Sequence, residues 1–129
     1  MKILFLSNLY PPLARGGYEQ WCQEMAVALS ERGHQLAVLT SSAYREVQVA
    51  EEESVRVHRL LIPEVEQGLS NTALRLLRDR NQLEEQNVLH VEKIVTDFQP
   101  DVALIWGMWN IPRSVPARVE QLLPGRVAY

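Results

Sequence analysis

The sequence is poor in the features that stabilise small secreted proteins or anchor membrane proteins. It contains one cysteine, Cys22, so no intramolecular disulfide can form, which fits a reducing compartment. None of its apolar runs approaches the roughly 18 residues of a membrane span. The run at residues 3–6 is also too short for the core of a signal peptide. These absences predict a cytoplasmic protein.

The sequence also lacks a basic excess and the common nucleotide and metal motifs. Its 13 Lys and Arg residues against 16 Asp and Glu residues give a net charge of −3, which argues against a nucleic-acid binder. The three histidines have no metal-ligand spacing. Neither GxGxxG nor the GK[ST] ending of a P-loop occurs. We therefore expect no metal, no resident cofactor and no nucleic-acid partner.

Apolar segments alternate with helical patterns along the chain. The apolar segments are continuous rather than alternating, which is typical of parallel strands covered on both faces. Strands are predicted at residues 3–6, 35–40, 55–62 and 102–106, with the start of a fifth at 126–129. Helices are predicted at residues 18–32, 71–98 and 112–123. The pattern predicts an α/β, Rossmann-like three-layer domain with a mostly parallel sheet.

Three local features carry further expectations. The helix at 18–32 has an apolar stripe, formed by Tyr18, Trp21, Cys22, Met25, Ala26 and Leu29, and Gly33 suits its C-terminal cap. The polar stretch 78–87 separates two apolar stripes of the long helix, so either one long helix projects into solvent or two helices meet near Asn87, and we favour a bend or break. Residues 41–54 predict a short exposed strand or hairpin arm with an acidic turn.

The loop that joins the first strand to the first helix is the first candidate site. It contains Pro11-Pro12 and then Gly16-Gly17 directly before the helix. A helix start leaves N–H groups unpaired, and glycines let a ligand approach the main chain. Gly16 and Gly17 therefore suit contact with a phosphate or a sugar, and a flexible turn is the alternative. Arg15 either grips a phosphate or is a solvated loop arginine.

Other candidates lie beside this loop, and each has a plainer interpretation. Tyr10 lines the cleft or packs under the proline loop, and Glu19 is a helix-start charge or a catalytic base. Trp109 stacks on a sugar or packs at an interface, and Asn110 bonds a hydroxyl or shapes a turn. For Trp106 we favour packing. Cys22 lies in an apolar stripe, which favours the core over catalysis.

The order of these motifs resembles a known family. The segments MKILFLSNLYPPLARGGYEQ and AVALSERGHQLAVLTS are similar to the N-terminal domain of GT-B glycosyltransferases of the family 4 type. VRVHRL and PDVALIWGMWNIP resemble their third and fourth strands. The resemblance implies two Rossmann-like domains that face each other across a cleft. The N-terminal domain mainly holds the acceptor, and the C-terminal domain holds a nucleotide-sugar donor and carries a Glu-x7-Glu motif.

The resemblance implies that this chain is the acceptor-side domain of a retaining glycosyltransferase, acting on a glycan, lipid-linked or small-molecule acceptor. By the family pattern, the loop of Gly16 and Gly17 contacts the transferring sugar and the donor phosphates. Arg15, which precedes the glycines, is expected on the donor side as well. The acceptor side is expected to include Tyr10, Glu19, Trp109 and Asn110. No catalytic residue is assigned, because many members carry a histidine near the end of the fourth strand, where this chain reads Trp106-Gly107-Met108-Trp109.

Several expectations concern what lies outside residues 1–129. The chain ends inside an apolar segment, so we expect a truncated N-terminal domain whose donor-binding partner domain is missing. Alone it is expected to lack transferase activity and to self-associate through uncovered apolar surface. Peripheral membrane contact is expected if the acceptor is lipid-linked. The alternative function is a non-catalytic α/β module that binds a carbohydrate or a partner.

Overall fold

The computed structural model describes residues 1–42, 54–64 and 73–129, with side chains of the long helix described from Arg80 onward. The strands are β1 (Lys2–Ser7), β2 (Gln35–Ser41), β3 (Val55–Leu61), β4 (Val102–Gly107) and β5 (Val127–Ala128). The helices are α1 (Gly17–Glu31), α2 (Ala73–Phe98) and α3 (Ser114–Leu122). The predicted strand at 41–54 falls mostly on residues 43–53, which lie outside the described residues.

The strands form one parallel sheet in the order β3-β2-β1-β4-β5. The chain runs outward from β1 to β3 and then returns to the other side of β1 to form β4. The carboxyl ends of β1 and β4 therefore flank the point where the strand order reverses, which is where open α/β sheets bind ligands. The predicted Rossmann-like α/β fold is confirmed.

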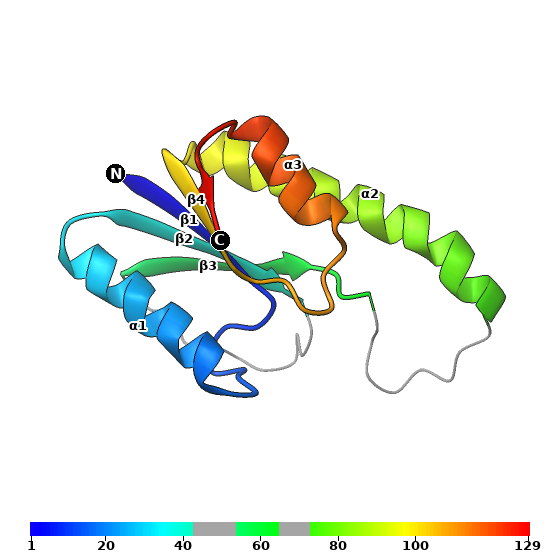
Figure 1. Ribbon diagram of the computed structural model, residues 1–129, viewed down its shortest axis with the longest axis horizontal. Coiled ribbons are helices and arrows are strands. Elements are labelled where there is room, and N and C mark those ends of the chain that lie inside the picture. Colours follow the sequence, from blue (N-terminus) through cyan, green and yellow to red (C-terminus); the bar gives the residue numbers. More distant parts are fainter. Residues whose placement is uncertain (43–53, 65–72) are drawn as a thin grey trace.

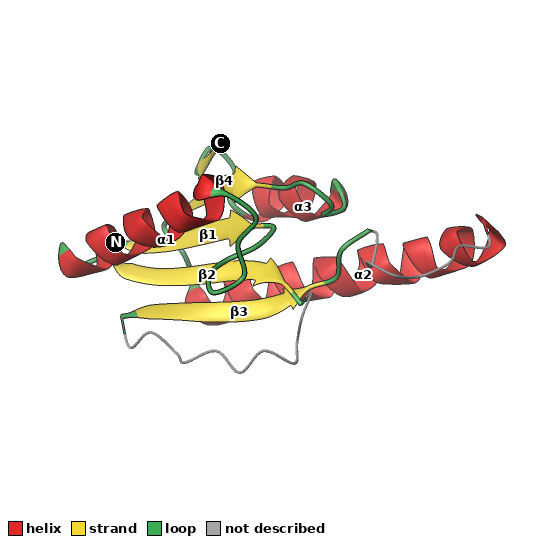
Figure 2. Cartoon of the chain, turned by 90° about the horizontal axis from the view of Figure 1, so that it is seen from below, coloured by secondary structure: helices red, strands yellow, loops and turns green. Residues whose placement is uncertain are grey.

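Helix α1 covers one face of the sheet, and α2 with α3 covers the other (Figure 1 and Figure 2). Successive residues of β1 point to opposite faces, so Phe5 joins the core under α1 while Leu4 and Leu6 join the core under α2 and α3. Burying each such side chain stabilises the fold by about 1.5–3 kcal/mol. Coverage on both faces explains why the predicted strands are continuous apolar runs.

Helix α1 ends as the sequence predicts but is covered less than expected. Gly33 adopts φ 85° and donates to the Ser30 carbonyl (2.8 Å), while the N–H of His34 donates to the Leu29 carbonyl (3.2 Å). These two bonds define the glycine cap at the helix C-terminus. Within the apolar stripe, however, Tyr18, Trp21 and Met25 are exposed and only Cys22 and Ala26 are fully buried. The stripe is wider than the helix–sheet contact.

The expected bend in α2 is wrong. Ala73–Phe98 is one unbroken helix, and its N-terminal part extends past the end of the sheet (Figure 2). The reason lies in Asn87, which is fully buried and does not compete with the helix backbone. Its Oδ1 accepts from the Ile62 N–H (2.7 Å) and its Nδ2 donates to the Ile62 carbonyl (2.9 Å). Asn87 thus fixes the chain where it leaves β3.

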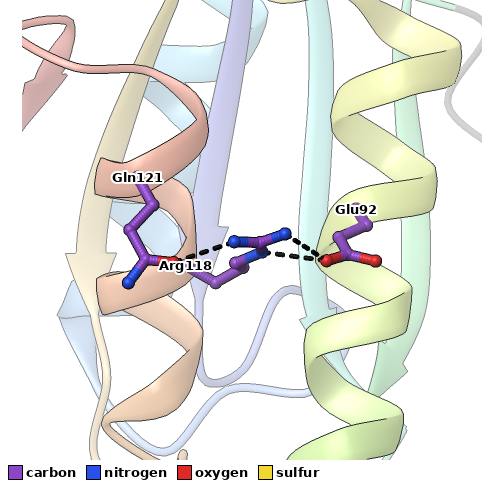
Figure 3. Close-up of polar contacts among 3 residues, drawn as sticks. All are labelled: Glu92, Arg118 and Gln121. Carbon is purple, nitrogen blue, oxygen red and sulfur yellow. Dashed lines mark hydrogen bonds and ion pairs between the residues drawn. The ribbon is translucent and has the colours of Figure 1, made fainter.

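Helices α2 and α3 are joined by a polar contact above their shared core. Arg118 of α3 donates through Nε to Glu92 Oε1 of α2 (2.9 Å) and through Nη1 to Gln121 Oε1 (2.9 Å), as Figure 3 shows. Val115 and Val119 of α3 are buried beneath, as the predicted helix at 112–123 requires. No helix in the described parts combines the length and apolar character of a membrane span.

Candidate functional site

The loops that follow β1 and β4 meet at the point where the strand order reverses. The N–H of Asn8 donates to the carbonyl of Gly107 (2.7 Å), and the β1–β4 register shifts between Leu6 and Ser7. The site predicted from the sequence therefore lies at the carboxyl edge of the sheet, with the β1–α1 loop on one side and the β4–α3 loop on the other.

The first half of the β1–α1 loop, residues 8–13, is hydrogen-bonded to β2. The Asn8 carbonyl accepts from the Ser41 N–H (3.1 Å) and from Thr40 Oγ1 (3.1 Å). The Ser7 hydroxyl donates to the Leu9 carbonyl (2.6 Å). Both Thr40 and Ser7 are buried, so these bonds are shielded from water. We call residues 8–13 the loop base.

Tyr10 lies inside the loop base rather than on its surface. Its side chain is 1% exposed and belongs to the core cluster under α1. A sugar cannot stack on a ring in this position. The plainer interpretation, that Tyr10 packs under the proline loop, fits the structure. The predicted role of its ring in acceptor contact would need a different conformation.

The second half of the loop, residues 14–17, is open, and we call it the rim. Gly16 adopts extended backbone angles (φ −165°) that any residue tolerates, and no atom lies within 4 Å of a Cβ built on Gly16 or Gly17. Glu19 Oε2 accepts from the Gly16 N–H (3.1 Å), and the glycine N-cap offers no side-chain acceptor to the first helical turn. Glu19 thus serves the helix start, as its plainer interpretation holds.

Trp106 locks the start of α1 against β4. Its ring stacks on Phe5 with centroids 6.0 Å apart and meets the edge of Tyr18 at 6.1 Å. Its Nε1 donates to the Tyr18 carbonyl (2.8 Å). The packing interpretation of Trp106 is therefore correct. The same bond ties the first turn of α1 to the end of β4.

Arg15 and Trp109 lie together across the two loops. The guanidinium of Arg15 is 5.1 Å from the ring centroid of Trp109, a cation–π contact. Trp109 remains 65% exposed, so one partner of the pair is open to a ligand. An exposed contact of this kind contributes about 0.5–1 kcal/mol. The structure thus unites two residues that the sequence placed on separate loops.

Asn110 shapes the β4–α3 loop. It adopts a positive φ of 61°, a conformation that asparagine tolerates better than most residues. Its carbonyl accepts from the Glu64 N–H (2.9 Å) in the segment that follows β3. This bond brings a third loop to the carboxyl edge. The geometry fits the turn-forming interpretation of Asn110.

Sequence reasoning missed Arg59 of β3. Its Nη1 donates to the Tyr10 carbonyl (3.0 Å) and its Nη2 to the Pro11 carbonyl (2.7 Å). Burial lowers the pKa of the guanidinium from its usual value. The sequence did contain one signal for this residue. Arg59 follows Val55 and Val57 on the same face of the strand, so a charged residue stands in an apolar row.

The remaining reactive groups lie away from this edge or are inert. His34 lies at the amino end of β2, with its Nδ1 3.4 Å from the terminal nitrogen of Met1. Burial raises the pKa of Cys22 to about 12, which suppresses the reactive thiolate. Across residues 1–42, 54–64 and 73–129, no group of three or more His, Cys, Asp or Glu side chains could hold a metal ion.

Comparison with known proteins places this geometry in a family. A search of curated proteins gives no match to the chain. The family described as "Glycosyl transferase 4-like domain" matches residues 16–125, from the first rim glycine to the turn before β5. The match covers most of the sequence. It includes Gly16, Gly17 and the whole β4–α3 loop, and it begins after Arg15 and the loop base. The chain belongs to the glycosyltransferase 4-like family and is a glycosyltransferase-type domain with a Rossmann-like fold.

Proposed function

We propose that this chain is the acceptor-side domain of a retaining glycosyltransferase, which moves a sugar from a nucleotide-sugar donor to a hydroxyl of a glycan, lipid-linked or small-molecule acceptor. Family membership supports glycosyl transfer in general. The donor's main binding surface would come from a second domain on the far side of the cleft. That domain is the principal partner that we propose.

One observation carries the proposal for the rim. The fold requires glycine at neither Gly16 nor Gly17, because Gly16 is extended, Gly17 begins a helix, and nothing lies within 4 Å of either added Cβ. The absence of side chains instead leaves the main chain accessible from outside. Access to a helix start that lacks a side-chain cap suits an anionic ligand such as a diphosphate.

The chemistry of transfer suits these groups. The bond between the anomeric carbon and the donor phosphate breaks, and its electron pair leaves with the nucleoside diphosphate. A new bond forms from the anomeric carbon to the acceptor oxygen, and the proton of that hydroxyl passes to the departing diphosphate. Negative charge therefore grows on the diphosphate. In this proposal the N–H groups of the first turn of α1 and the Arg15 guanidinium offset that charge, provided that they are fixed beforehand.

The acceptor side of the site follows from the exposed aromatic surface. Trp109 offers an open ring beside Arg15, and sugar rings stack on such surfaces. Glu19, in the first turn of α1, and Asn110, on the β4–α3 loop, would supply polar groups at the edges. Tyr10 would contribute through its backbone, which shapes the base beneath the rim.

A non-catalytic carbohydrate-binding module is the second candidate. The 65% exposure of Trp109 favours it, since a stacking surface binds saccharides without any donor. The two candidates predict different ligands for the same edge of the sheet. A transferase domain responds to nucleoside diphosphates, and a binding module responds to saccharides alone.

Titration of the ¹⁵N-labelled chain, followed by amide and indole chemical shifts, separates the candidates. We expect uridine, guanosine or adenosine diphosphate to shift the amides of Gly16, Gly17 and Tyr18. A shift of the Trp109 indole by oligosaccharides, with no response to any diphosphate, would favour the binding module. Shifts confined to the amino edge around His34 would contradict both candidates.

A further inference from the structure

Arg59 interrupts an apolar row of β3 at the functional edge. It pairs with Thr40 of β2 in the sheet register, two residues before the strand ends at Leu61. Val55 and Val57, on the same face, pack into the core under α1. An aliphatic residue at position 59 would continue this row. Position 59 instead holds a half-buried guanidinium near the carboxyl edge of the sheet, beside the β1–α1 loop.

The guanidinium makes a forked contact with the loop base. Nη1 bonds the carbonyl of Tyr10 (3.0 Å) and Nη2 bonds the carbonyl of Pro11 (2.7 Å), so one planar group holds two consecutive peptide units. A lysine carries the same charge but offers a single point of contact. The fork therefore fixes the orientation of the peptide units as well as their position.

Arg59 supplies a partner to both of these carbonyls, and the Tyr10 carbonyl also accepts from the backbone. Pro11 and Pro12 have no N–H, and the loop base belongs to neither a helix nor a strand. Within the base, the Leu13 N–H reaches the Tyr10 carbonyl (3.2 Å), while Arg59 supplies the contact to the Pro11 carbonyl. The loop thus relies on a residue that comes from two strands away.

No acid competes for Arg59 among the described residues, where the ion pairs join Arg80 to Glu84, Lys93 to Asp97 and Arg118 to Glu92. Burial disfavours the charged guanidinium, and neutral carbonyls offset that cost less well than a carboxylate. The arginine nevertheless forms two hydrogen bonds that a valine or leucine could not form. Its contacts indicate that the contribution is the shape of the loop.

We propose that Arg59 is a positioning residue for the rim. By holding the Tyr10 and Pro11 carbonyls, it sets the direction in which residues 14–17 leave the base. That direction decides where Arg15 and the first N–H groups of α1 meet a ligand. The part of the inference that concerns the ligand rests on the proposed function, and the part that concerns the loop does not.

Four forms of the chain test this inference: the unchanged protein, Arg59→Met, Arg59→Lys and Arg56→Met. Arg56 is the matched control, because it lies on the same strand but is exposed. The first readout is hydrogen exchange at the Leu13 amide, which bonds the Tyr10 carbonyl, compared with the amides of Leu39 and Val91 in the core under α2 and α3. The second readout is the affinity for nucleoside diphosphates.

In Arg59→Met we expect exchange at Leu13 to accelerate about tenfold relative to the core amides, the effect of about one lost charge-assisted bond. Diphosphate affinity should fall by a comparable factor. For Arg59→Lys, both the exchange rate at Leu13 and the diphosphate affinity should lie between those of the unchanged protein and those of Arg59→Met. Arg56→Met should change neither readout. If Arg59→Met fails to fold, Arg59→Lys decides by the same comparison.

An acceleration at Leu13 that equals the acceleration in the core would overturn the inference, because Arg59 would then support stability in general. Unchanged exchange at Leu13 would overturn it as well. If the unchanged protein binds no diphosphate, the proposed function loses its support at this rim. The exchange at Leu13 still decides whether Arg59 positions the loop.

Discussion

The two halves of the β1–α1 loop differ in almost every physical respect. In the base, residues 8–13, the backbone is bonded to β2 and β3, and Leu9 and Tyr10 are buried. In the rim, residues 14–17, every residue is exposed and no atom approaches the added Cβ positions of the glycines. One half is built like a core and the other like an open surface.

This difference separates stability from recognition along a single loop. Fixed groups stabilise developing charge better than groups that must reorganise, so a recognition surface benefits from a rigid support. The base provides that support through Thr40 and Arg59, which lie on two different strands. Changes in the base should therefore cost folding free energy, whereas changes in the rim should leave folding nearly intact.

The largest loss of stability is expected for Tyr10→Ala in the base. Removing a fully buried large aromatic side chain leaves a cavity and typically costs about 3–5 kcal/mol. Tyr18→Ala is the matched control, because Tyr18 is 62% exposed, and its loss should cost about 1 kcal/mol or less. Urea unfolding followed by circular dichroism measures both. Equal losses for the two tyrosines would show that burial of the Tyr10 ring adds nothing to the stability of the base.

A smaller loss is expected for Thr40→Val, which keeps the shape of a fully buried side chain but removes its hydroxyl. The Asn8 carbonyl loses one of two donors and retains the Ser41 N–H, so the free energy of unfolding should fall by about 1 kcal/mol. Thr96→Val, on the exposed side of α2, is the control and should change the free energy of unfolding by less than about 0.5 kcal/mol. A Thr40→Val protein as stable as the parent would show that this bond does not secure the base.

The sequence indicated the strands and helices well because their signals are local. The continuous run Ile3 to Leu6 reflects coverage on both faces, and Gly33 marks a helix end that needs a positive φ. Both features are decided within a few residues. The expected break at Asn87 failed because a polar residue inside a helix has two outcomes. Only the position of β3 shows that Asn87 bonds Ile62 instead of opening the helix.

The candidate site was less predictable, because its contacts join distant segments. Arg15 and Trp109 are far apart in sequence, and their stacking depends on how β1 and β4 pair. The contact from Arg59 to Tyr10 crosses β2, so no local pattern could reveal it. The exposed half of α1 shows the same limit. Periodicity identifies apolar residues but does not state which of them a neighbour covers.

A modest loss of stability is expected for a change where the rim joins α1. Glu19→Ala removes the acceptor of the Gly16 N–H, so the free energy of unfolding should fall by about 0.5–1 kcal/mol. Glu19→Gln keeps an acceptor oxygen and should lose less. Glu24→Ala, at an exposed position in the middle of α1, is the control for a lost acidic residue. Matching losses for Glu19→Ala and Glu24→Ala would show that the contact with Gly16 contributes nothing.

The smallest change in stability, and the sharpest test of the rim, is expected for Gly16→Ala. Alanine tolerates φ −165° and meets no neighbour, so the free energy of unfolding should change by less than about 0.5 kcal/mol. The added methyl group nevertheless narrows the approach to the helix start, so affinity for nucleoside diphosphates should fall. Gly33→Ala should instead lower the free energy of unfolding by about 1 kcal/mol or more, because alanine is strained at a φ of 85°. It should leave the affinity for diphosphates unchanged, because Gly33 lies far from the site. Thermal unfolding and diphosphate titration of both variants measure this crossed pattern. A Gly16→Ala protein that binds as well as the parent would mean that the rim glycines serve no ligand.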